Sequence, residues 1–313
     1  MNLRRLLQRL RQRLPRRRHV LPAGRFAGTS RWLESTQEVA RWERVRRAGM
    51  RWGIWGAVLG TLIGVLLFAP AAWLAGTVGR ATQGRLLLAD AEGTIWTGSA
   101  VAVLTGGPGS RDARTLPGRL SWTLRPHGVG LALTLEQPCC LNGRPVVTVR
   151  PGLGRMLITV EGAPGGTGAG GDWLGQWPAA WLAGLGTPWN TLDLGGALRL
   201  STQGLALEWV QGRWRMAGQA ELALREVSSR VTTLERLGSY RLMIAGDAAT
   251  GGATMSLFTE SGALQLSGSG QWDAAGARFR GEARAAEDQQ GALDNLLNII
   301  GRRAGDRSII SIG

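Results

Sequence analysis

Apolar residues follow two different patterns along the chain, and the change between them comes near residue 80. From Trp52 to Gly79 the chain has no charged residue, and a run this long and apolar is typical of a helix that spans a membrane. Beyond residue 80, apolar residues mostly alternate with polar ones, which is typical of half-buried antiparallel strands. The pattern therefore predicts a mainly β fold, with a single N-terminal transmembrane helix over residues 50–79 and few short helices after it.

The alternating runs are separated by Gly, Pro, Asn, Asp and Ser, the residues that favour turns. Clear examples are residues 131–135, 198–201, 205–209, 220–224 and 264–272. One face of each strand is expected to be buried and the other left in water. These runs favour one extended or sandwiched antiparallel sheet.

A glycine-rich linker, residues 162–171, divides the outer part of the chain. It separates an N-terminal β subdomain, residues 80–161, from a C-terminal β subdomain, residues 172–313, that ends in a helix. The pattern leaves open whether these are two domains or one continuous sheet.

Three short helical pieces are predicted within the β region. The first, residues 172–181, has tryptophans at a four-residue spacing behind an aspartate that suits the cap position, and a proline limits its length. The second, residues 232–235, has the Thr-x-x-Glu spacing of a capping box. The third, residues 293–300, carries an i, i+3, i+4, i+7 apolar stripe and is expected to dock on the sheet.

Charge is concentrated before the apolar run. All 37 basic residues are arginine, and 15 of them lie in residues 1–51 beside three glutamates. The high net charge therefore belongs to the tail, and it does not indicate a nucleic-acid partner. Because cytoplasmic flanks of membrane helices are rich in Arg, the N-terminus is predicted to be cytoplasmic and the β region periplasmic.

Two alternatives concern the start of the chain. Residues 1–49 form either a basic cytoplasmic tail, which lies on an anionic leaflet, or an upstream stretch outside a native product that begins at Met50. A signal peptide cleaved near Ala71 is the rival to an uncleaved anchor. Within the apolar run, Gly53, Gly56, Gly60 and Gly64 form a stripe of small residues that suits helix–helix packing.

Residues for familiar catalytic chemistry are scarce. The chain has no lysine and two histidines, His19 and His127. The glycines of residues 166–171 have the spacing of a dinucleotide-binding loop, but Pro178 interrupts the long helix that such a site needs. The sequence therefore predicts a protein that is not an enzyme and has no cofactor, metal site or catalytic residue.

Cys139 and Cys140 are adjacent, a spacing that does not suit a CxxC metal or redox motif. In an oxidising periplasm they form a disulfide with each other, remain free thiols in a loop, or form bridges to other chains. Pro138 and the Asn142-Gly143 pair supply turn residues that suit the strained ring between neighbours.

Several segments, in order, resemble the type II secretion system protein N family over about residues 50–313. These are Glu92-Gly-Thr-Ile-Trp-Thr-Gly-Ser99, residues 116–126, residues 237–242, residues 296–303 and Ser311-Ile-Gly313. Residues 1–49 depart from the short cytoplasmic tail of that family. Within the shared segments, Trp96 and Trp122 are the strongest candidates for structural or interface residues.

The resemblance implies a non-catalytic component of the bacterial inner membrane that supports export of folded periplasmic proteins through protein–protein contacts. Its expected partners are other components of the secretion system, above all the bitopic subunit that contacts the outer-membrane pore. The residues themselves leave a second hypothesis open, since long amphipathic strands also suit an apolar groove in a periplasmic protein that handles lipids or other envelope components.

Overall fold

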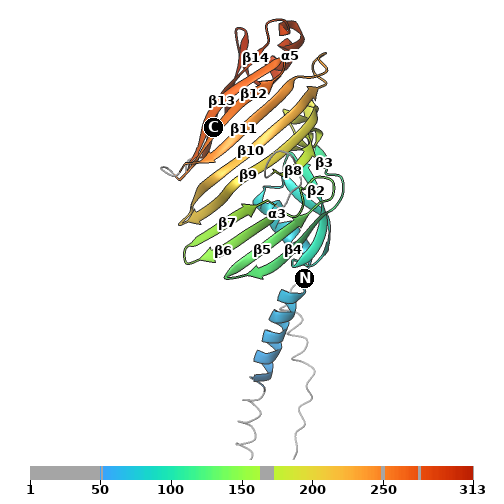
Figure 1. Ribbon diagram of the computed structural model, residues 1–313. Helices are drawn as coiled ribbons and strands as arrows, with labels where there is room; N and C mark the ends of the chain where they lie inside the picture. The colour runs from blue at the N-terminus through green and yellow to red at the C-terminus, as the bar shows by residue number, and fades with distance from the viewer. Residues whose placement is uncertain (1–49, 51, 163–172, 248–250, 274–275, 313) are drawn as a thin grey trace, which may run out of the picture. The chain divides into compact units, whose positions relative to one another are not determined.

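The computed structural model describes residues 50, 52–162, 173–247, 251–273 and 276–312 (Figure 1). The predicted basic tail lies outside the described residues, as do residues 163–171 of the glycine-rich linker with their dinucleotide-like spacing. The chain divides into two units, Met1–Ile63 and Gly64–Gly313, and each is described by itself.

Residues 52–67 are helical, and most of this helix belongs to the first unit. Its large apolar side chains, such as Trp55 and Leu59, are exposed. Within the described part of the chain, no helix has both the length and the apolar composition of a membrane span. A Cβ atom added at Gly53, Gly56 or Gly60 meets nothing within 4 Å, so a packing role for the glycine stripe stays a prediction.

The second unit begins inside the uncharged stretch. The chain is extended at Pro70, which forms an isolated bridge with Thr94, and helix α3 (Ala71–Ala81) follows. The residue before a proline disfavours helical geometry, which accounts for the break. Ala71 is buried with Ala100 and Trp122, so the range predicted as one anchor contains an exposed helical stretch and a second helix that packs on the β region.

Sixteen strands of the described residues belong to one sheet. The first eight are β1 (Leu86–Gly93), β2 (Thr97–Thr105), β3 (Ala113–Thr115), β4 (Leu120–His127), β5 (Gly130–Glu136), β6 (Val146–Gly152), β7 (Arg155–Glu161) and β8 (Trp173–Pro178). The others are β9 (Leu194–Val210), β10 (Arg213–Ser229), β11 (Gly238–Gly246), β12 (Ala253–Ser261), β13 (Leu264–Asp273), β14 (Gly276–Ala285), β15 (Arg302–Ala304) and β16 (Arg307–Ile312).

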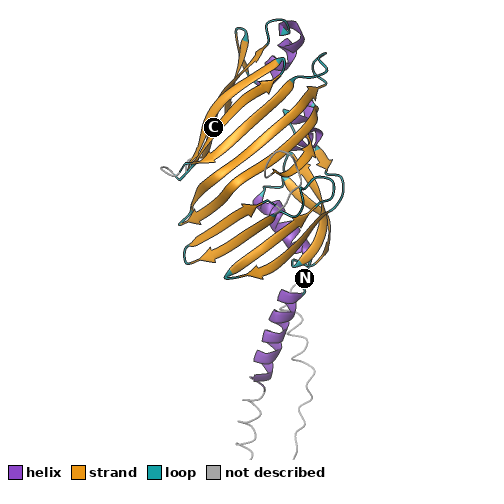
Figure 2. Ribbon diagram, in the orientation of Figure 1, coloured by secondary structure: helices purple, strands orange, loops and turns teal. Residues whose placement is uncertain are grey.

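The strand order is β1-β2-β4-β5-β6-β7-β9-β10-β11-β12-β13-β14-β16-β15, with β3 also paired to β2 and β8 to β9. Figure 2 shows how neighbouring strands of this meander follow one another across the sheet. The predicted mainly antiparallel β fold with few helices is confirmed. Because β7 pairs with β9, the strands before and after the glycine-rich linker share one sheet.

The helical predictions have mixed outcomes. The terminal helix is confirmed as α5 (Gln290–Ile300), with Leu293, Leu296 and Leu297 buried. The prediction for residues 172–181 is wrong for the described part up to Pro178, because Trp173 and Trp177 lie on strand β8. Trp181 lies in the 3₁₀ helix η1 (Ala179–Leu185), before the short helix α4 (Trp189–Leu192).

The capping box predicted for residues 232–235 is also not formed. Those residues form bends, and the hydroxyl of Thr232 donates a hydrogen bond to the carbonyl oxygen of Ala292 at 3.0 Å. The same hydroxyl accepts from the backbone N–H of Leu234 at 3.2 Å. A tertiary contact to α5 therefore replaces the local cap.

Two groups of core residues lie against the same face of the sheet. One joins α3 to the sheet through Ala71, Ala100 and Trp122. The other, at the opposite end of the strand order, joins α5 to the sheet and includes Tyr240 and Ala283. When the paired positions are followed from strand to strand, Trp122 and Tyr240 lie on the same face of the sheet. Both helices therefore cover parts of one face.

The core beneath α5 contains a buried tyrosine hydroxyl, that of Tyr240. It is 3 % exposed, and its hydroxyl has no hydrogen-bond partner. Burial raises the pKa of the Tyr240 hydroxyl, because the charged phenolate is poorly solvated there. The unfolded chain therefore loses this proton at a lower pH than the folded chain, and stability falls as pH rises from about 10 towards the folded-state pKa.

We expect Tyr240→Phe to be neutral or to stabilise the fold by about 1 kcal/mol at neutral pH, because it removes an unsatisfied buried hydroxyl. The variant should also lose less stability between about pH 9 and pH 11 than the wild type. Denaturant unfolding of the full chain in detergent, followed across this range, measures both effects. Equal slopes for the two proteins would show that Tyr240 does not titrate with folding.

Candidate interaction surfaces

The segment Glu92–Ser99 forms the turn between β1 and β2. Gly93 has φ +85°, a conformation that favours glycine, and the Thr94 hydroxyl accepts backbone N–H groups of Trp96 and Thr97. A Cβ atom on Gly98 would lie 2.6 Å from the ring of Trp122 and 2.7 Å from the carbonyl oxygen of Glu92. The glycines of this segment are therefore explained by a tight turn and a close approach.

The two tryptophans predicted as structural or interface residues have different surroundings. Trp122, on β4, is 3 % exposed and packs with Ala71 and Ala100. Trp96 is half-buried, and its indole N–H donates a hydrogen bond to the carbonyl oxygen of Leu66 at 2.8 Å. The backbone N–H of Ile95 donates a hydrogen bond to the carbonyl oxygen of Ala69. These two bonds connect the β1–β2 turn to the segment that precedes α3. A role for either tryptophan in binding a partner stays a prediction.

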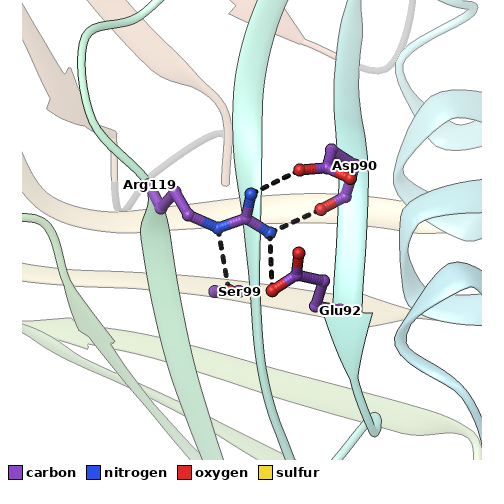
Figure 3. Close-up of polar contacts among 4 residues, drawn as sticks. All are labelled: Asp90, Glu92, Ser99 and Arg119. Atoms are coloured by element: carbon purple, nitrogen blue, oxygen red, sulfur yellow. Dashed lines mark hydrogen bonds and ion pairs between the residues drawn. The ribbon is translucent and has the colours of Figure 1, made fainter.

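Arg119 joins three strands through its guanidinium group (Figure 3). Nη1 lies 2.5 Å from Oδ2 of Asp90, and Nη2 lies 3.3 Å from Oε2 of Glu92. Nη2 also donates to the backbone carbonyl of Asp90 at 2.6 Å, and Nε donates to the Ser99 hydroxyl at 3.1 Å. The hydrogen bond to the Asp90 carboxylate is the main cause that raises the pKa of Arg119 above its ordinary value. The Arg119 guanidinium group is therefore permanently charged, and its contacts connect β1, β2 and the start of β4.

The same contacts close the β1 edge of the sheet. Asp90 has φ +50°, and the pairing of β1 with β2 shifts between Ala89 and Glu92, as in a β-bulge. Because Arg119 occupies the carbonyl oxygen of Asp90, this part of the edge has fewer free backbone groups for another strand. Bulges and edge charges are devices by which proteins prevent strand addition.

The opposite edge of the sheet is only partly covered in the described residues, by the short strand β15, which carries Arg302 and Arg303. Strand β15 pairs with Arg307–Ile309 of β16, whereas Ile310–Ile312 are paired only with β14. The outer side of Ile310–Ile312 therefore offers an unpaired edge. The sequence pattern did not identify it, because the local pattern of a strand does not show which neighbours it will have.

A hollow of about 530 Å³ lies on the polar face between β12, β13 and β14. Its charged side chains are already paired: Glu260 with Arg241, and Glu282 with both Arg284 and Arg307. Arg241 lies over the ring of Phe258 at 5.9 Å and also faces Glu221 at 3.3 Å. This arrangement is a charge ladder across neighbouring strands, which stabilises the sheet.

The remaining candidate residues show no assembled catalytic group. Cys139 and Cys140 are joined in a disulfide between neighbours, and Sγ of Cys139 lies 3.0 Å from the carbonyl oxygen of Pro117. His127 is exposed at the end of β4. Among the described residues, no group of three or more His, Cys, Asp and Glu is arranged to hold a metal ion.

Comparison with known families agrees with the resemblance inferred from the sequence. The family model described as Type II secretion system (T2SS), protein N matches residues 84–310, a range that contains β1 to β15 and most of β16. No curated protein and no solved structure matches the chain. The family match implies a role in type II secretion and a location in the cell envelope. The chain belongs to the type II secretion system protein N family.

Proposed function

We propose that the protein is a non-catalytic inner-membrane component of the type II secretion system, which supports export of folded periplasmic proteins by binding another component of the machine. The family match over residues 84–310 is the observation that carries this proposal. The proposed partner is the bitopic inner-membrane subunit that contacts the outer-membrane pore.

The anchor of the proposed protein lies in the uncharged stretch after Met50, with the N-terminus in the cytoplasm and the β unit in the periplasm. Supporting this, the apolar side chains of residues 52–68 are mostly exposed, and the arginine excess lies before them. Extraction of membranes at alkaline pH tests the anchor. Release of the full-length protein into the soluble fraction would contradict it.

Strand addition at β16 is the proposed mode of binding. The two edges differ, since β1 is interrupted by a bulge and held by Arg119, whereas Ile310–Ile312 have an unpaired outer side. A partner strand there would satisfy its backbone hydrogen bonds along β16.

Site-specific photo-cross-linking tests this edge. A photoreactive amino acid is placed at Ser311, on the free edge, and in a matched variant at Ser269, which lies on the central strand β13. We expect the Ser311 variant to form a cross-link with the bitopic subunit in membranes, and the Ser269 variant to form several-fold less. Equal cross-linking at both positions, or none at Ser311, would contradict strand addition at this edge.

A further inference from the structure

The two faces of the sheet differ in chemistry from β4 to β14. The register places Leu131, Val149, Ile158, Leu207, Ile244 and Met255 on one face. From β4 to β14, the side chains that the pairing places on this face include no Asp, Glu, Arg or His. The other face of the same strands carries charged residues such as Arg150, Glu221 and Arg280.

A bulge keeps this separation intact across the longest strands. In the pairing of β9 with β10, Ala217 lies opposite Ala206 and Gln219 lies opposite Gln203. β9 therefore advances by three residues where β10 advances by two. One extra residue in β9 changes which alternate positions face inward, so Leu200 and Leu207 fall on the same side. Without it, the distal half of β9 would turn Glu208 towards the apolar face.

Only part of the apolar face is covered by the described residues. The α3 and α5 cores lie along the edge that includes Trp122, Tyr240 and Ala283. The other half, nearer the β4–β5, β6–β7 and β9–β10 turns, is not part of these cores. Met216 and Ala253 are buried there, whereas most of its other side chains are half-exposed. We call this half, represented by the six residues from Leu131 to Met255 named above, the open strip. An uncharged surface of this length is unusual on a protein that has no ligand or partner.

The chemistry of the open strip favours binding of hydrocarbon chains over binding of a peptide. The strands pair on both sides along it, so their backbone groups are already bonded within the sheet, and the side chains offer CH groups. A peptide laid across it would bury N–H and C=O groups without partners, at a cost of about 1–3 kcal/mol each on protein scales. Acyl chains carry no such groups, and they fit an extended apolar surface.

The turns that border the open strip have the features of a lipid headgroup zone. Arg125, Arg150, Arg155 and Arg213 lie at the strand ends beside three neighbouring turns, where the register places their side chains on the polar face of the sheet. Because they lie at the edge and are long, a headgroup held at this edge meets them while its acyl chains lie on the other face. No carboxylate of the described residues is paired with them. These turns follow one another along one edge of the sheet (Figure 1). Arginine binds phosphate oxygens in a bidentate manner, so this edge complements an anionic headgroup.

Apolar residues at the same turns point to a membrane as the source of the lipid. Val129 is 83 % exposed at the β4–β5 turn, and Leu153 is fully exposed at the β6–β7 turn. Trp209 and Trp214 face each other across β9 and β10, close to the third turn. Tryptophan and arginine beside exposed apolar tips are typical of segments that lie at a bilayer surface.

We propose that the open strip binds the acyl chains of an anionic phospholipid, whose headgroup lies at the arginines of the turn edge. This rests on the proposed envelope location, but it is independent of strand addition at β16. Bound lipid would cover the strip and hold the turn edge at the membrane surface.

The test uses the full chain in nanodiscs that contain phosphatidylglycerol with a photoactivatable diazirine in one acyl chain. After irradiation, labelled residues are identified by peptide fragmentation and mass spectrometry. We expect labels on Leu207, Ile244 and Met255, and at least several-fold fewer on Ser256 and Ser269 of the polar face. Labels confined to residues 52–68, or absent from the strip, would overturn the proposal even if the β16 cross-link forms.

Two neighbouring residues provide a matched pair of variants. Leu207→Gln introduces an amide on the strip, whereas Glu208→Gln introduces the same amide on the opposite face. We expect Leu207→Gln to lower strip labelling about threefold or more, because the amide loses hydrogen bonds to water under an acyl chain, and Glu208→Gln to leave it unchanged. Equal labelling of the wild type by a zwitterionic phosphatidylcholine analogue would overturn the headgroup assignment.

Discussion

Replacement of Trp122 by alanine is expected to lower the free energy of unfolding by about 3–5 kcal/mol, the range for truncating a large buried aromatic side chain. Trp122 is 3 % exposed and lies between α3 and the sheet, where it packs with Ala71 and Ala100. The backbone close to it is fixed, since Gly98 leaves no room for a Cβ atom between the ring and the β1–β2 turn. The resulting cavity therefore cannot collapse easily.

Two control variants separate packing from other effects of the change. Trp122→Phe retains an aromatic ring and removes an indole N–H that has no hydrogen-bond partner, so it should cost much less than Trp122→Ala. Trp189→Ala truncates a tryptophan that is 37 % exposed, so it should cost clearly less than Trp122→Ala. Denaturant unfolding of the full chain in detergent, followed by circular dichroism, compares the three. A Trp122→Ala variant within 1 kcal/mol of the wild type would show that this core does not hold α3.

Much of the fold was predictable because it depends on local alternation. Runs such as residues 131–135 and 220–224 alternate strictly, and they lie in β5 and β10. The segment 172–181 failed for an identifiable reason. A spacing of four residues suits a strand with period two as well as a helix with period 3.6, and pairing with β9 decided the outcome for Trp173 and Trp177.

The interaction surfaces were less predictable, because they depend on partners distant in sequence. Arg119 meets Asp90 from 29 positions away, and no spacing rule connects them. The unpaired edge at Ile310–Ile312 exists because β15 is only three residues long. Trp122 and the terminal helix could be identified in advance, since a buried aromatic residue and an amphipathic stripe carry local signals. The uncharged face needed the register of every strand, including the bulge in β9.

The second large effect is expected at the other end of the sheet, for Leu296→Ala in α5. Leu296 is 1 % exposed and belongs to a core with Leu237 and Leu264. Truncation of a buried leucine typically costs about 2–5 kcal/mol. Other contacts also hold α5, including the Thr232 hydroxyl that donates to the carbonyl oxygen of Ala292 at 3.0 Å. We therefore expect the variant to fold but to unfold at lower denaturant concentration.

Asn298→Ala is the matched control, since Asn298 lies on the exposed side of the same helix. It removes no buried surface and replaces a weak helix former by a strong one, so its stability should lie within about 0.5 kcal/mol of the wild type. Hydrogen exchange then locates the change caused by Leu296→Ala. If α5 separates from the sheet first, exchange rises in α5, β14 and β16, while β4 and β5 stay protected. A uniform rise across all strands would instead show that α5 and the α3 core unfold as one cooperative unit, because loss of a contact at one end would then lower the stability of the whole sheet equally.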